Sequence, residues 1–395
     1  MSPAPICGAP GPQPLALYIH TPWCLRKCPY CDFNSHVAET PPFERYVDRL
    51  LADLDWELSA PAARRPLQSI YIGGGTPSLL PGPAIQRLLD GIRSRCDLTP
   101  GIEISLEANP GARDAERFAA YRAAGVDRLS IGVQSLDAGR LRALGRVHGP
   151  DEARETVHLA RSAGFENINL DLMFALPEQG LADAEHDLLE LIALAPEHIS
   201  YYQLTLEPNT WLHAHPPPLP DEDLTADMAE RGEALLARAG YARYEVSAYA
   251  RPGRRCRHNL NYWRFGDYLG IGAGAHGKLT LATPRGESWM VRRTAKRRHP
   301  TAYLDSAPDA AISSTRDLDE SDLILELALN ALRLTLGFER DLISRVTGLP
   351  ETPIRPILNA AAADGLLRLT DTHIEPTELG RRFLDDLVAR FARGA

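Results

Sequence analysis

Apolar, β-branched runs alternate with segments of helical periodicity along most of the chain. The strand-like runs are LALYIH (15–20), SIYIGG (69–74), IEISLEA (102–108), RLSIGVQ (128–134), NINLDLM (167–173) and HISYYQL (198–204). Between them, apolar positions recur at helical spacing in 43–59, 83–95, 112–124, 137–144, 151–163 and 181–194, and several of these segments end in Gly. Such regular alternation predicts a parallel sheet covered by helices.

The number of repeats indicates the kind of sheet. Six strand–helix units are too few to close a barrel, although a further helical segment (222–239) and a strand-like run (241–250) follow. We therefore predict an α/β fold whose main domain, 15–280, is a partial, open-sided (β/α)6 barrel. In barrels the functional residues follow the C-terminal ends of the strands, which here run into HTPWC, GGGTPS, EANPG and VQS.

The character of the chain changes after residue 280. A basic stretch, RRTAKRR (292–298), lies in a segment that we interpret as a linker, 281–317. Helical patterns near 319–335, 338–346, 352–364 and 378–392 then enclose a short β-like pair, LLRLT and HIEPT. This order predicts a small winged-helix-like α+β domain at 318–395. Its many carboxylates argue against DNA binding.

Composition excludes several classes of protein. The chain has 395 residues, 44% of them hydrophobic, so it can bury large cores. Its formal net charge of −9 argues against a nucleic-acid partner. The Pro- and Gly-rich lead-in, 1–14, is expected to be disordered and lacks the basic residues of a targeting signal. Charge or proline soon breaks every apolar run, so we expect a soluble, cytoplasmic protein.

Three of the six cysteines crowd into eight residues directly after the first strand, at Cys24, Cys28 and Cys31. In a reducing compartment this crowding indicates a metal site rather than disulfides. Structural zinc usually has four protein ligands, and only His20 or His36 is near enough in sequence to be the fourth. A [4Fe–4S] cluster on three cysteines instead leaves one iron open for a small molecule. The spacing alone leaves both metals open. The remaining cysteines are scattered: Cys7, Cys96 and Cys256.

The pattern Cys-x3-Cys-x2-Cys, with Tyr30 before the last cysteine, resembles the signature of the radical S-adenosylmethionine (SAM) superfamily. The resemblance implies a radical SAM barrel, with a [4Fe–4S] cluster on Cys24, Cys28 and Cys31 and SAM on the open iron. In such proteins the cofactor supplies the difficult chemistry, and the protein positions and shields it.

Further segments extend the resemblance over roughly residues 15–280. LYIHTPWC, YIGGGTPS, EANPG, LSIGVQS, LGRVH, NLDLMFALP, YQLTLEP, HNLNYW and GIGAGAHG occur in the order seen in the oxygen-independent coproporphyrinogen III oxidase family. The pattern is most similar to the HemW-type heme chaperone branch of that family. By position, the resemblance implies that the following residues bind SAM: Tyr18, Tyr30, Gly74, Gly75, Thr76, Glu107, Gln134, Arg146, Asp171 and Thr205.

The residue types suit these roles. Bare glycine backbone lets carbonyl groups approach the amino end of SAM at Gly74 and Gly75. The guanidinium of Arg146 suits a carboxylate, and the carboxylate of Asp171 suits a ribose diol by accepting two hydrogen bonds.

Two departures from the family pattern bear on activity. The oxidases carry a further cysteine two residues after the third cluster cysteine, where this chain has Phe33. They also have a longer N-terminal segment, whereas only 17 residues precede Tyr18 here. Both departures argue against decarboxylation of coproporphyrinogen III, which stays the alternative function.

The segment HNLNYW (258–263) matches the HNxxYW pattern of the chaperone branch. The resemblance implies a heme site at His258, Asn259, Tyr262 and Trp263, since histidine can ligate iron and aromatic rings can cover a macrocycle. Cys256 is the rival axial ligand. We therefore expect a carrier that binds heme and passes it to an acceptor protein of unknown identity. Membrane association of a donor or acceptor stays open, and no nucleic acid is expected.

Overall fold

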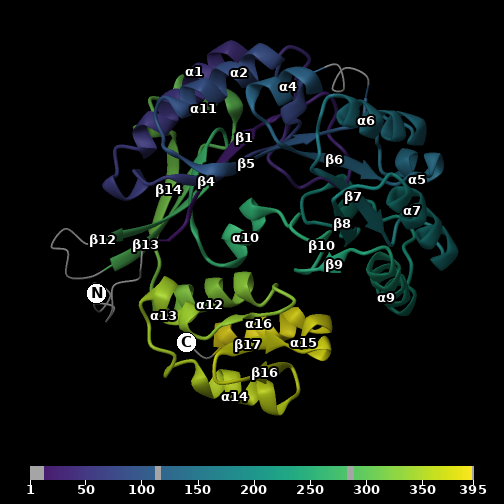
Figure 1. Cartoon of the computed structure of the whole chain (residues 1–395), viewed down its shortest axis with the longest axis vertical. Helices are drawn as coiled ribbons and strands as arrows, with labels where there is room; N and C mark the ends of the chain where they lie inside the picture. Colours follow the sequence, from purple (N-terminus) through teal and green to yellow (C-terminus); the bar gives the residue numbers. More distant parts are fainter. Residues whose placement is uncertain (1–12, 112–116, 283–288, 394–395) are drawn as a thin grey trace.

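The computed structural model of the protein describes residues 13–111, 117–282 and 289–393. Its centre is a curved 12-stranded sheet with helices on its outer side (Figure 1). Most of the predicted lead-in, 1–14, lies outside the described residues, as does Cys7. In sheet order the strands are β14 (Ile312–Asp317), β13 (Trp289–Lys296), β12 (His276–Ala282), β11 (Asp267–Ile271), β1 (Leu15–Thr21), β4 (Leu67–Gly74), β5 (Leu98–Ala108), β6 (Arg128–Gln134), β7 (Ile168–Phe174), β8 (His198–Gln203), β10 (Ala248–Ala250) and β9 (Ala242–Arg243).

The six predicted strands correspond to β1, β4, β5, β6, β7 and β8, and they lie side by side in chain order, all parallel. The partial barrel is therefore confirmed. One more parallel strand, β11, pairs with the free edge of β1. Their outward-facing side chains, such as Leu17, Ile72 and Leu129, are buried in the main hydrophobic core.

Helices follow most of the strands and cover the outside of the sheet (Figure 1). The expected helix 112–124 begins at Phe118 in the described residues, since 112–116 fall outside them. The helices are α1 (Phe43–Glu57), α2 (Gly82–Arg93), α4 (Phe118–Ala124), α5 (Ala138–Ala143), α6 (Pro150–Ser162), α7 (Leu181–Ala193), α8 (Trp211–Ala214), α9 (Glu222–Arg238), α10 (Arg257–Trp263) and α11 (Pro300–Asp305).

The basic segment interpreted as a linker, 281–317, instead extends the main sheet through β13 and β14. Three of its basic side chains are paired, namely Arg292 with Asp317, Arg293 with Glu326 and Lys296 with two carboxylates. The Lys296 ammonium is buried and lies 2.7 Å from Asp53 Oδ1 and 2.5 Å from Glu57 Oε1, both on α1. The linker prediction was wrong because these carboxylates are far from Lys296 in sequence, so no local pattern shows the pairing.

The C-terminal part forms a second core around a three-stranded sheet, β15 (Phe338–Glu339), β17 (His373–Pro376) and β16 (Leu367–Leu369). The start of the expected helix 338–346 is a strand because Phe338 pairs with Ile374, and the expected helix 378–392 is divided near Phe383. The helices are α12 (Glu320–Ala331), α13 (Asp341–Thr347), α14 (Arg355–Ala363), α15 (Glu378–Arg382) and α16 (Leu384–Arg393).

Two residues of the main sheet region, Phe265 and Val291, are buried in this second core, so the two parts share an apolar contact. Among the described residues, no helix is both long and apolar enough to cross a membrane.

Candidate functional site

The loop after β1 carries the clustered cysteines. Cys24 ends β2 (Trp23–Cys24), and the pairing of β2 with β3 (His36–Val37) closes the loop. Within it, the Cys31 backbone N–H donates to the Cys28 carbonyl at 3.1 Å. All three cysteines line one cavity of about 770 Å³. Burial raises the pKa of Cys24 and of Cys31, so each favours its neutral thiol until a cation stabilises the thiolate.

His20 has no free ring nitrogen with which to be the fourth protein ligand of a zinc ion. Its Nδ1 is 3.0 Å from the Tyr18 hydroxyl and its Nε2 is 2.8 Å from the Asn34 carbonyl oxygen, so both ring nitrogens are in use. Within the described ranges, no group of three or more His, Cys, Asp or Glu is placed to hold a single metal ion. Three cysteines facing a common cavity are the donor set of a [4Fe–4S] cluster with one open iron.

The glycine loop after β4 is tied to the cysteine loop. The Gly75 N–H donates to the Thr21 carbonyl at 2.7 Å, and the Thr76 N–H donates to the Trp23 carbonyl at 2.8 Å. The Thr76 hydroxyl also lies 3.4 Å from Cys24 Sγ. A Cβ at Gly75 would be only 2.6 Å from the Trp23 carbonyl oxygen. From the sequence, Gly75 was expected to allow close approach of a ligand. The structure adds a second reason, because a side chain at Gly75 would prevent the contact between the two loops.

Glu107 on β5 lies at the centre of this region. Its carboxylate accepts a hydrogen bond from the Tyr71 hydroxyl at 2.9 Å and another from the Gly74 N–H at 3.1 Å. Gly74 has a φ of 116°, a conformation that favours glycine. Burial raises the pKa of Glu107 to about 7, with a further contribution from the Asp171 carboxylate. Glu107 can therefore accept a hydrogen bond from a ligand ammonium group once it is ionised.

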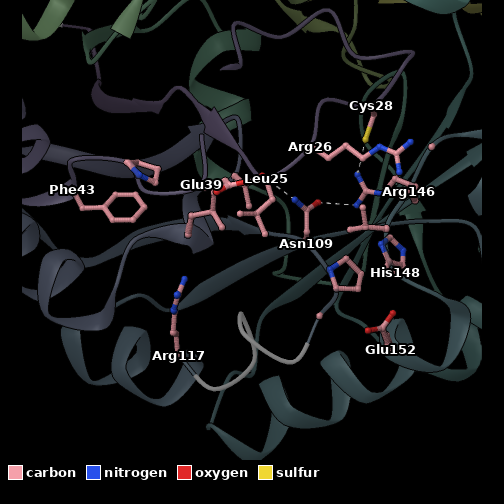
Figure 2. A pocket seen from close by; sticks show the side chains of 17 residues that line it. Leu25, Arg26, Cys28, Glu39, Phe43, Asn109, Arg117, Arg146, His148 and Glu152 are labelled. Atoms are coloured by element: carbon pink, nitrogen blue, oxygen red, sulfur yellow. Dashed lines mark hydrogen bonds between the residues drawn. The ribbon is translucent and has the colours of Figure 1, made fainter. Parts of the chain in front are cut away.

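Arg146 connects the cysteine loop to the ends of two strands. Its Nη2 donates to Asn109 Oδ1 at 2.7 Å and to the Gly132 carbonyl at 2.6 Å, and its Nη1 lies 3.7 Å from Cys28 Sγ (Figure 2). Burial by itself lowers the pKa of Arg146, but Tyr30 and Cys28 raise it, so the guanidinium stays charged. Its Nε has no partner among the described residues, which leaves a donor for a carboxylate. Arg146, Asn109 and Cys28 also line a smaller pocket of about 310 Å³ (Figure 2).

The remaining predicted SAM residues lie along the same cavity. Gln134 ends β6 with a φ of 70°, and its Oε1 accepts from the Tyr202 hydroxyl at 2.7 Å. Burial raises the pKa of Asp171, which accepts a hydrogen bond from Asn169 at 2.8 Å. The Thr205 hydroxyl is exposed and donates to Glu207.

The structure thus gathers the cluster cysteines and nearly all the predicted SAM residues around one cavity. The exception is Tyr18, which lines a neighbouring cavity of about 650 Å³. The two cavities share Asp32, Phe33, Gly74 and Glu107, so they adjoin.

The predicted heme residues do not converge in this way. His258 is 1% exposed, with Nδ1 3.0 Å from Ser69 Oγ and Nε2 3.0 Å from the Tyr262 hydroxyl. Burial lowers the pKa of His258 to about 3. An iron ligand needs a free ring nitrogen, and His258 has none in this structure. Ser69 of the barrel wall bonds one nitrogen, and Tyr262 of the same helix bonds the other. The rival Cys256 does line the larger cavity, with Sγ 3.6 Å from Glu103 Oε1.

The other members of HNLNYW face three directions. Asn259 lines the cavity of about 770 Å³, and Tyr262 lines the adjoining cavity of about 650 Å³. The Trp263 ring packs under the Arg333 guanidinium at 4.3 Å, on the side of the C-terminal core. In this conformation α10 therefore separates the two cavities rather than facing one of them.

Several polar residues of the larger cavity were missed from the sequence: Tyr71, Asn109, Arg128, Ser130, Asn169, His198 and Ser200. A signal for most of them was present. In RLSIGVQ the polar or small residues alternate with Leu, Ile and Val, and INLD and HISY alternate similarly. Since alternate residues of a strand face opposite sides, this pattern indicates a polar barrel interior.

Comparisons with known proteins agree with this site. Residues 18–191 match the family model of the radical SAM superfamily, and residues 318–383 match that of the HemN C-terminal domain. A radical SAM protein carries SAM and a [4Fe–4S] cluster, which fits the three-cysteine loop.

Relatives cover nearly the whole chain. The heme chaperone HemW of Escherichia coli is 49% identical over 96% of this chain and 98% of that protein. The heme chaperone HemW of Haemophilus influenzae is 44% identical over 96% of this chain and 98% of that protein. A structure of the coproporphyrinogen III oxidase HemN from Escherichia coli has a TM-score of 0.80 at 23% identity, covering 98% of this chain and 92% of that one, and so shares the fold.

Serine in place of Cys24, Cys28 or Cys31 should abolish the cluster, because a hydroxyl is a poor substitute for a thiolate on iron. Serine at Cys96 or Cys256 should leave cluster iron at the parental level. Iron and acid-labile sulfide after anaerobic reconstitution measure both. A similar loss of iron at Cys96 or Cys256 would contradict the three-ligand assignment.

Gly75→Val should lower cluster content as well as SAM affinity, because the added side chain pushes the Trp23 carbonyl and with it the cysteine loop. Gly149→Ala is the matched control, since a Cβ there meets nothing within 4 Å. A Gly75 variant with parental cluster iron but weak SAM binding would show that this glycine serves the ligand alone.

Glu107→Gln should change how stability depends on pH. In the folded apoprotein the pKa of Glu107 is about 7, above its ordinary value, so the folded state holds a proton that the unfolded chain has released. Glu107 thus destabilises the fold increasingly from about pH 4.5 to 7, by about 3 kcal/mol in all. Urea unfolding of the parent and the variant across this pH range should show that the free energy of unfolding falls less steeply with pH in the variant. Parallel pH profiles would mean that Glu107 is ionised throughout.

Proposed function

Because this chain belongs to the radical SAM superfamily and, within it, to the family of the heme chaperone HemW, we propose that it binds heme and transfers it to an acceptor protein. The protein would do so while holding SAM on a [4Fe–4S] cluster. The acceptor is a protein of unknown identity.

The observation that carries this proposal is the position of α10. This helix bears HNLNYW and lies inside the open side of the barrel (Figure 1). Asn259 contributes to the cavity that holds the cluster cysteines, and Tyr262 contributes to the adjoining cavity. A planar ligand bound along α10 would therefore lie next to the SAM site, and the Tyr262 ring, which lines the adjoining cavity, would contact its apolar face.

The SAM residues act in this proposal as a positioning and shielding wall. Glu107 and the glycine loop hold the amino end of SAM, and the free Nε of Arg146 holds its carboxylate. Tyr30 lines the cavity and packs beside an apolar cluster that includes Met173 and Leu204. When bound to the reduced cluster, SAM supplies one-electron chemistry.

Oxidative decarboxylation of a porphyrinogen is the less favoured function. Phe33 borders both cavities and is 57% exposed, at the position where the oxidases of the resembling family carry a cysteine. A phenyl ring can contact a macrocycle but cannot take part in proton or electron transfer as a thiol can.

An axial-ligand role for His258 requires one of its two hydrogen bonds to open. The bond from Nε2 to the Tyr262 hydroxyl is the one that faces a cavity residue, so we propose that heme competes for Nε2. The bond from Nδ1 to Ser69 would then keep the ring oriented.

His258→Ala should lose heme, whereas Tyr262→Phe should retain or strengthen heme binding because it releases Nε2 from its internal partner. Absorption spectra of heme titrations under anaerobic conditions measure affinity and reveal a change of axial ligand. Cys256→Ser serves as the comparison for the rival ligand, and cluster iron should stay at the parental level in all three variants. Loss of heme from Cys256→Ser with full retention by His258→Ala would assign the ligand to the cysteine.

The same preparations distinguish carrier from oxidase. The parent protein with coproporphyrinogen III, SAM and a reductant should give no protoporphyrinogen IX while retaining added heme. Robust decarboxylation without heme retention would replace the carrier function by the oxidase function.

A further inference from the structure

Arg128 is a buried cation that the site described so far does not use. It is the first residue of β6, is 2% exposed, and lines the cavity of about 770 Å³. Its Nε is buried without a partner, and the hydrogen bonds and ion pairs of the described residues include none made by its guanidinium. A buried guanidinium without a partner is costly, since both its charge and its N–H groups lose water.

The acidic groups near Arg128 already have other partners. Glu103 Oε1 accepts from the backbone N–H groups of Arg257 at 2.9 Å and His258 at 3.3 Å, so it caps the start of α10. Asp171 is bonded to Asn169. Burial alone lowers the pKa of Arg128, but its interactions with Cys256 and Glu103 raise it, so the side chain remains a cation.

A second unsatisfied polar atom lies on the neighbouring strand. Ser105 is paired in register with Arg128, is fully buried, and its Oγ has no hydrogen-bond partner within the described ranges. Ser105 is not among the residues that line the cavity, so of these two side chains only Arg128 is placed to meet a ligand there. A buried guanidinium with a free donor at the wall of a cavity is suited to an anionic oxygen of a ligand.

The place of Arg128 along the barrel identifies the ligand. The carboxylate of SAM must lie at the cluster end, where Arg146 approaches Cys28. Arg128 and Gln134 stand at opposite ends of β6, roughly 20 Å of strand apart at about 3.3 Å per residue. Arg128 instead lies near Cys256, and both line the cavity together with Asn259 of α10.

We propose that Arg128 binds a propionate carboxylate of heme inside the barrel. This inference rests on the proposed function and adds the orientation of the ligand. The propionate edge of heme points into the barrel toward β5 and β6, and the macrocycle extends along α10. Arg333, the other arginine in this region of the cavity, is already paired with Glu245 at 3.0 Å.

The test compares heme with its dimethyl ester, which has the same macrocycle but no carboxylates. The anaerobically reconstituted full chain should bind heme about tenfold to a hundredfold more tightly than the ester. Arg128→Gln should lose that preference by weakening heme binding and leaving ester binding as it was. Arg128→Lys should restore part of it. SAM affinity and cluster iron should match the parent in both variants.

Arg49→Gln is the control, since Arg49 is also buried but bonds backbone carbonyls on the far side of α1. It should keep the parental preference. Equal binding of heme and ester by the parent, a preference that survives in Arg128→Gln, or a loss confined to SAM affinity would each overturn the assignment. If the parent retained neither heme nor ester, the proposed function itself would fail. If Arg128→Gln does not fold, the preference for heme over its ester is compared between the parent and Arg128→Lys. A full parental preference in Arg128→Lys would then contradict the assignment.

Discussion

Backbone hydrogen bonds between the cysteine loop and the glycine loop hold the site together. Gly75 and Thr76 donate to carbonyl groups of Thr21 and Trp23, and this contact leaves no room for a side chain at Gly75. It fixes Cys24 relative to Gly74 and, through Gly74, relative to Glu107 on the next strand. The predicted cluster ligands and the predicted SAM-binding residues of these loops thereby belong to one rigid unit. Their relative placement depends on main-chain geometry rather than on flexible side chains.

The second constraint is the polar interior of the barrel. Its strands are apolar on the helix side and carry Glu, Arg, Ser, Asn, Asp and His on the inner side. Burial of such groups is unfavourable unless they are satisfied, and many are, through pairs such as Asn169 with His198 and Tyr71 with Glu107. Two buried groups that keep an unsatisfied nitrogen, Arg128 and Arg146, both line the larger cavity.

The helix α10 links this interior to the rest of the molecule. Its first turn is capped by Glu103 in the barrel, and its last residue packs against Arg333 from the C-terminal part. Phe265, just beyond it, is buried in the C-terminal core. A movement of α10 that releases the His258 ring would therefore change contacts in the barrel and in the C-terminal part.

The sequence by itself determined the β/α order, the cysteine loop and most of the residues that line the larger cavity beside it. Each rests on a local pattern: strand and helix periods, the cysteine spacing, and polar residues at strand ends, which a parallel sheet necessarily brings to one edge. Tertiary structure alone decided the rest. Residues 289–296 became a strand because Lys296 meets carboxylates of α1 more than 200 positions away. Both ring nitrogens of His258 are bonded, to Ser69 and Tyr262, and Arg128 Nε has no partner within the described ranges, because only the folded chain determines which buried polar groups meet.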